Sequence, residues 1–97
     1  MNLIYTQYNK MLDISHVRSI FQMQRSSAEM QSVYYLMTEL DSMELVCIGA
    51  FSDADEAKTM MTELRDWSCD DNEDSVFSVS EMAEYMGIAL VPQMKGA

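Results

Sequence analysis

The stretch that decides the fold is residues 32–67, SVYYLMTELDSMELVCIGAFSDADEAKTMMTELRDW. Residues 32–40 and 44–51 are rich in β-branched and aromatic residues, and Asp41-Ser42-Met43 separates them, which predicts two strands joined by a turn. Ser52 and Asp53 then begin a helix whose first-turn acids suit its N-terminal dipole. Its apolar stripe is Ala57, Met60, Met61, Leu64 and Trp67. This strand–turn–strand–helix order is the strongest structural signal in the chain.

The returning strand is apolar on both of its faces. Val46, Ile48 and Ala50 lie on one face, and Leu45, Cys47 and Phe51 on the other. A sheet with one solvated face would alternate apolar and polar residues more cleanly. We therefore expect the hairpin to be central, with a helix on one face and a helix or a partner protein on the other.

Shorter signals fill the rest of the chain. Residues 3–8 suggest an extended piece, and apolar residues at helical spacing predict a helix over residues 15–25. Residues 76–80 predict a third strand, and residues 80–86 a helix stopped by Gly87. The prediction is one acidic α+β domain over residues 1–97, with a small antiparallel sheet of three to four strands packed with two to three helices.

Charge divides the chain sharply. Its 97 residues include 16 Asp and Glu but only 6 Lys and Arg, a net charge of −10. Residues 39–84 carry fourteen acidic and two basic residues, a local net charge of −12, whereas the flanking segments are slightly positive. This balance argues against direct binding to nucleic acid or to an anionic membrane. Negative charge that is concentrated in one part of a small domain suggests a basic partner. A surface that only keeps the protein soluble would explain the same composition.

Catalytic motifs are missing from the sequence. His16 is the only histidine, and three glycines do not form a phosphate-binding loop. We therefore predict that the protein is not an enzyme and has no cofactor. No signal peptide or apolar run of about twenty residues is present, which predicts a cytoplasmic protein.

One acidic segment has the spacing of an EF-hand calcium loop. Between residues 70 and 81, oxygen ligands stand at loop positions 1, 3, 5 and 12, namely Asp70, Asn72, Asp74 and Glu81. Position 6 is Ser75, where the turn favours glycine, and no second loop is present to pair with it. A calcium-binding module is thus an alternative, and the other interpretation of the segment is an acidic loop between helix and strand.

The remaining acidic residues form the candidate binding surface. Glu56 and Glu63 stand about 10 Å apart along one helix face at the usual helical rise. Duplex DNA presents a negative charge about every 1.7 Å of its axis, so a carboxylate row can imitate phosphates for a groove lined by Lys and Arg. The predicted partner-binding residues are Asp53, Asp55, Glu56, Glu63, Asp66, Asp70, Asp71, Glu73 and Asp74.

The chain resembles small acidic phage-encoded proteins, including the DNA-mimic anti-CRISPR proteins of type I-F. It resembles them in its size, in its hairpin–helix unit and in its acidic block over residues 53–74. The resemblance spans residues 32–84, is compositional and carries no residue-level signature. It implies an inhibitor in the bacterial host cytoplasm that binds the Csy surveillance complex at the Cas8f and Cas7f surfaces that grip target DNA. A third interpretation is a small homodimeric phage accessory protein that pairs through the two-faced hairpin.

Overall fold

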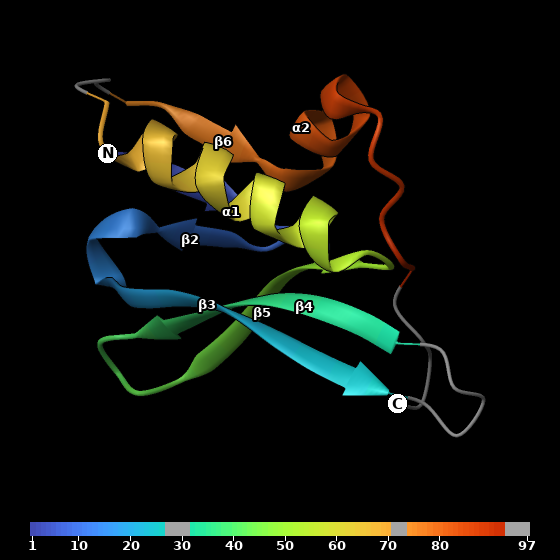
Figure 1. The fold of residues 1–97 in the computed structure, drawn as a ribbon. Coiled ribbons are helices and arrows are strands. Elements are labelled where there is room, and N and C mark those ends of the chain that lie inside the picture. The colour runs from blue at the N-terminus through green and yellow to red at the C-terminus, as the bar shows by residue number, and fades with distance from the viewer. Residues whose placement is uncertain (27–31, 71–73, 93–97) are drawn as a thin grey trace.

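The computed structural model describes residues 1–26, 32–70 and 74–92. These residues form two sheets and two α helices, which confirms the α+β class (Figure 1). In chain order the elements are β1 (Leu3–Tyr5), β2 (Met11–Asp13), the 3-10 turn η1 (Ile14–His16), β3 (Val17–Ser26), β4 (Ser32–Leu40), β5 (Leu45–Phe51), α1 (Ala54–Ser68), β6 (Val76–Ser78) and α2 (Val79–Met86).

The larger sheet is antiparallel and has the strand order β3-β4-β5. It confirms the predicted hairpin, since β4 and β5 pair from Tyr34–Phe51 to Glu39–Leu45, with an irregularity between Leu36 and Met37. The connecting turn is closed by a bond of 2.9 Å from the amide of Leu40 to the carbonyl of Glu44. Of the hairpin that we expected to be central, only β4 has a strand on each side, while β5 lies at an edge of the sheet.

The helix predicted over residues 15–25 is wrong. Only Ile14–His16 forms a helical turn, and Val17–Ser26 is instead the strand β3. β3 pairs with β4 from Val17–Leu40 to Ser26–Ser32, with one irregularity between Val17 and Ser19. The apolar residues of this segment fit a period of two as well as a helical period, and pairing with β4 satisfies its backbone groups.

A second, mixed sheet was not predicted. It has the order β2-β1-β6, with β1 antiparallel to β2 and parallel to β6. The predicted third strand ends at Ser78, because the Ser78 side chain caps α2 by accepting a bond from the amide of Glu81. α2 confirms the predicted C-terminal helix, and Gly87 ends it with a left-handed φ of 72°.

α1 joins the two sheets through one core. It packs across the face of the larger sheet that carries Leu36 and Thr38, and Trp67 at its far end reaches Phe77 of β6 (Figure 1). The buried core draws on both sheets and both helices: Ile4, Leu12, Leu36, Val46, Ile48, Phe51, Ala57, Met60, Leu64, Phe77, Val79 and Ala83. No helix in the described part of the chain is long and apolar enough to cross a membrane.

Candidate functional site

The solvent-facing side of α1 is divided by charge. Helical geometry turns the chain by about 100° per residue, which places four acids within an arc of about 100° and two cations on the opposite flank. The acids are Asp55, Glu56, Glu63 and Asp66, and the cations are Lys58 and Arg65. From Asp55 to Asp66 the acids extend for about 16 Å along the helix axis. We refer to these four acids as the acidic row.

The two flanks of α1 face different parts of the molecule. The flank of Glu56 and Glu63 lies toward Trp67, whose ring centroid is 5.5 Å from that of Phe77 in β6. The flank of Arg65 faces β3, with which it lines a groove of about 530 Å³. The acidic row is therefore directed away from β3.

Two of the predicted binding acids have local partners. The carboxylate of Asp53 accepts a bond of 2.7 Å from the amide of Asp55 and so caps α1. The carboxylate of Asp66 lies 3.5 Å from the guanidinium of Arg65, and both side chains are largely exposed. An exposed ion pair of this kind contributes little stability, so Asp66 remains accessible to a partner, whereas Asp53 has a structural role.

The predicted binding acids that follow α1 in sequence do not all lie beside the acidic row. Asp70 is exposed just after the helix ends. Asp74 accepts a hydrogen bond from the N-terminal amine, and this contact lowers the pKa of its carboxyl group. Asp71 and Glu73 lie outside the described residues. The structure thus ties Asp74 to the start of the chain.

The segment proposed as a calcium loop is described only in part. Val76–Ser78, at loop positions 7 to 9, is the strand β6, which pairs in parallel with β1. Glu81 lies in the first turn of α2, and Asp74 contacts the N-terminus. Asn72 lies outside the described residues. Within residues 1–26, 32–70 and 74–92 no group of three or more His, Cys, Asp or Glu side chains could hold a metal ion.

His16 has a partner that sequence reasoning missed. Its Nδ1 lies 3.0 Å from Oδ2 of Asp41, and the hydrogen bond and the charge of Asp41 together raise the pKa of His16. The amide of Asp41 also donates to the carbonyl of His16 at 2.8 Å. These contacts fasten η1 to the β4–β5 turn, 25 residues away in sequence. No local motif could have indicated them.

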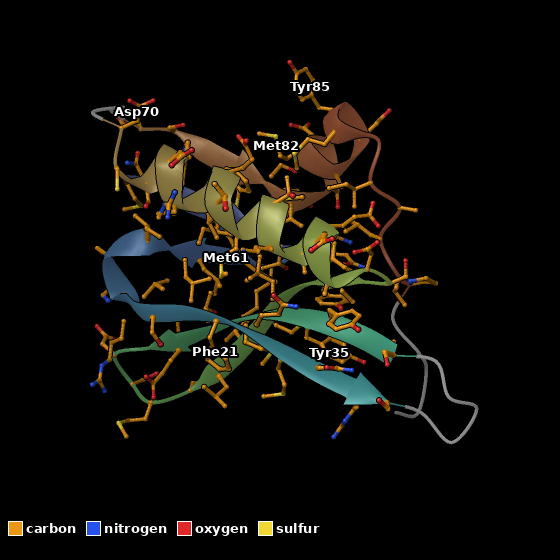
Figure 2. The ribbon with its side chains drawn as sticks, in the orientation of Figure 1. Phe21, Tyr35, Met61, Asp70, Met82 and Tyr85 are labelled. Atoms are coloured by element: carbon orange, nitrogen blue, oxygen red, sulfur yellow. The ribbon has the colours of Figure 1, made fainter. Side chains whose placement is uncertain are left out.

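Among the described residues, the two faces of the larger sheet are covered to different extents. α1 covers one face, as the hairpin predicted. On the other, which we call the outer face, the apolar side chains pack outside the main core: Phe21, Met23, Val33, Tyr35, Met37 and Leu45. Tyr8 reaches only one part of it, near Cys47, where the two polar atoms are 3.7 Å apart. Figure 2 shows Phe21 on the side of the sheet away from α1, and Met61 between α1 and β3.

Comparisons with protein-family models, with curated proteins and with solved structures found no match to this chain. The function argued below therefore rests on the charge and geometry of the chain's own residues and on the compositional resemblance given above.

Proposed function

We propose that this protein is a non-enzymatic inhibitor that imitates DNA and binds a basic nucleic-acid-binding surface of another protein. The observation that carries the proposal is the acidic row, whose four carboxylates share one side of α1 while Lys58 and Arg65 lie on the other flank. An acidic protein that only needs to remain soluble has no need to separate its charges in this way.

The acidic row has the dimensions of a short piece of DNA backbone. Its length of about 16 Å corresponds to roughly nine phosphates counted over both strands. Asp55 and Asp66 are exposed, Glu56 and Glu63 are half-buried, and all four residues belong to the single helix α1. Like charges along such a row raise the local negative potential and attract a groove lined by Lys and Arg.

Within the proposal, we expect some of the predicted acids to make the contact and others to stabilise the fold. Asp55, Glu56, Glu63 and Asp66 supply the row, and Asp70 extends it beyond the helix end. Asp53 and Asp74 instead support the fold, through the helix cap and the N-terminal contact. Asp71 and Glu73 lie outside the described residues, and we retain them as expected contact residues on the basis of the sequence.

The target that we propose is the type I-F Csy complex, at the Cas8f and Cas7f surfaces that bind target DNA, in the cytoplasm of a bacterial host. This choice follows the compositional resemblance to DNA-mimic anti-CRISPR proteins. A basic groove that recognises DNA through its phosphates, without reading base edges, is the kind of surface that a carboxylate row can occupy.

The test is a binding titration with purified Csy complex at low and at high salt, followed by competition with target duplex DNA. Binding that weakens steeply with salt and excludes DNA is expected, because exposed charges are screened beyond about 10 Å at 0.1 M salt. Formation of a ternary complex with DNA, or binding that is indifferent to salt, would contradict DNA mimicry.

A matched pair of variants then locates the contact. Glu56→Gln with Glu63→Gln removes two charges from the acidic row, and Glu81→Gln with Glu84→Gln removes two exposed charges from α2. The first pair should weaken binding about tenfold more than the second, since only it removes charges from the proposed contact. Equal losses would show that total charge, and not the acidic row, drives binding.

A further inference from the structure

The two edges of the larger sheet differ in their backbone partners. The outward edge of β5 is occupied: the amide of Gln7 donates to the carbonyl of Ile48 at 2.9 Å, and that of Val91 donates to the carbonyl of Ala50 at 2.9 Å. The Gln7 side chain also accepts a bond of 2.8 Å from the amide of Ala50. The amide of Val17 at the start of β3 donates to the carbonyl of Ile14. For residues 18–26 of β3, by contrast, the described residues supply no backbone partner other than β4.

The middle of β3, between Arg18 and Arg25, also lacks the features that usually protect an edge strand. Proteins shield exposed edges with lysine, proline, bulges or a covering element. Residues 19–24 of β3 contain no charge, no proline and no glycine. The irregularity of β3 lies at its start, between Val17 and Ser19, so the rest of the strand pairs with β4 without interruption. A long, regular, uncharged edge favours the addition of another strand.

We propose that β3 pairs antiparallel with β3 of a second copy of this chain, about a two-fold axis at Gln22, to form a continuous six-stranded sheet. This inference does not depend on the proposed function, and either can fail without the other.

The register follows from the alternation of side chains. Phe21, Met23 and Arg25 lie on the outer face with their β4 partners, while Ile20 and Gln22 pair with the buried Thr38 and Leu36. In a continuous sheet, each residue must lie opposite a residue whose side chain points to the same face. The two-fold axis between the two β3 strands must therefore pass through a residue position and not between two neighbouring residues. An axis at Gln22 places Met23 opposite Phe21 of the second copy, which gives the exposed Met23 a second aromatic neighbour besides Tyr35 of β4.

Charge selects this register among those that the alternation allows. With the axis at Gln22, Arg25 opposes Ser19 of the second copy, whose hydroxyl lies 3.5 Å from the carboxylate of Glu39. Glu39 of the second copy is then two strands away from Arg25. The two backbones are about 10 Å apart, a distance that the side chains of Arg25 and Glu39 can span together. An axis at Met23 would instead place Arg25 opposite Phe21. The symmetric pairing forms the Arg25–Glu39 contact twice.

The position of the acidic row removes the main objection to self-association. Two copies that each carry a net charge of −10 repel one another. The flank of α1 that faces β3 carries Arg65, whereas the acidic row is directed away from β3. The four charges of the acidic row are therefore kept on the far side of α1 from the proposed interface.

Sedimentation equilibrium of the full chain from about 1 to 500 μM tests the dimer, and a monomer over this whole range would overturn it. Met23→Lys places a charge on the outer edge of β3 and should weaken the dimer about tenfold or more. Met11→Lys is the matched control, because Met11 is a similarly exposed methionine on a strand of the other sheet. Circular dichroism establishes that both variants are folded, and equal dimer constants for the two would overturn the β3 interface.

Two further measurements test the register. In a Cys69→Ser background, Gln22→Cys should form an intermolecular disulfide readily, and Gln24→Cys, which opposes Ile20 of the second copy, should not. Arg25→Glu should weaken the dimer about tenfold, and Arg25→Glu combined with Glu39→Arg should restore it. Equal cross-linking at both positions, or a swap that restores nothing, would overturn the axis at Gln22.

Discussion

The indole Nε1 of Trp67 donates a hydrogen bond of 2.8 Å to the hydroxyl of Ser75, so the last full turn of α1 is fastened to the residue before β6. The same indole stacks at a tilt on Phe77. Ser75 in turn donates its amide to the Asn2 side chain at 3.0 Å. One side chain thus joins the helix that carries the acidic row to the smaller sheet.

Trp67→Phe should lower the free energy of unfolding by about 1 kcal/mol, since it keeps an aromatic ring against Phe77 but loses the hydrogen bond. Ser75→Ala should have a similar effect. Chemical denaturation of both single variants and of the double variant measures the coupling. If the two losses were simply additive, the bond would contribute nothing of its own.

The pair of His16 and Asp41 predicts a pH dependence. Asp41 raises the pKa of His16 above its ordinary value of 6.5. The stabilisation from this pair is therefore present below about 6.5 and is lost as the pH rises through the higher pKa of the folded state. An NMR titration of the His16 ring should show the raised pKa.

Asp41→Asn should return the pKa of His16 toward its ordinary value. Asp13→Asn is the control, because Asp13 contributes the smallest of the effects on His16. A larger shift in the Asp13 variant than in the Asp41 variant would contradict the observed pairing.

Asp53 should behave as a helix cap and not as a contact residue. Asp53→Ala is expected to cost about 1 kcal/mol of stability, and Asp53→Asn much less, since asparagine also caps helices well. Asp55→Ala removes the same charge without removing the capping side chain. Thermal unfolding compares the three, and an equal loss for Asp53→Ala and Asp55→Ala would mean that charge alone matters.

Gly49 is required by close packing. A Cβ at this position would lie 3.2 Å from Cγ1 of Val79 and 3.2 Å from the ring of Phe51, both fully buried. Gly49→Ala should therefore destabilise the fold by about 1–3 kcal/mol. Adding Val79→Ala makes room for the new methyl group, so the double variant should lose less stability than the sum of the two singles, as denaturant titration can show.

Local signals in the sequence were sufficient for much of this fold. The hairpin over residues 32–51 and the helix that follows are encoded by neighbouring residues: β-formers, a turn, a capping Asp53 and an apolar stripe. Gly87 similarly marks the end of α2. The acidic row was also visible, because helical spacing alone brings Glu56 and Glu63 to one flank.

Other features depend on contacts between distant parts of the chain. The segment Val17–Ser26 carries apolar residues compatible with a helix or a strand, and its pairing with β4 selects the strand. The parallel pairing of β1 with β6 joins segments more than 70 residues apart, so no local pattern announces it. For the same reason, sequence reasoning could not separate Asp74, which contacts the N-terminus, from the acids of the row.

The sequence by itself determined which residues are acidic, which segments favour strands, and where α1 begins, because these properties depend on side-chain chemistry and on neighbours within a few positions. Only the tertiary structure decided which strand edge receives further backbone bonds. Gln7 and Val91 reach the edge of β5 from distant parts of the chain, while among the described residues β3 has only β4 as a partner strand. The outward backbone groups of an edge strand form hydrogen bonds with segments that lie beside them. Which segments lie there depends on the complete fold.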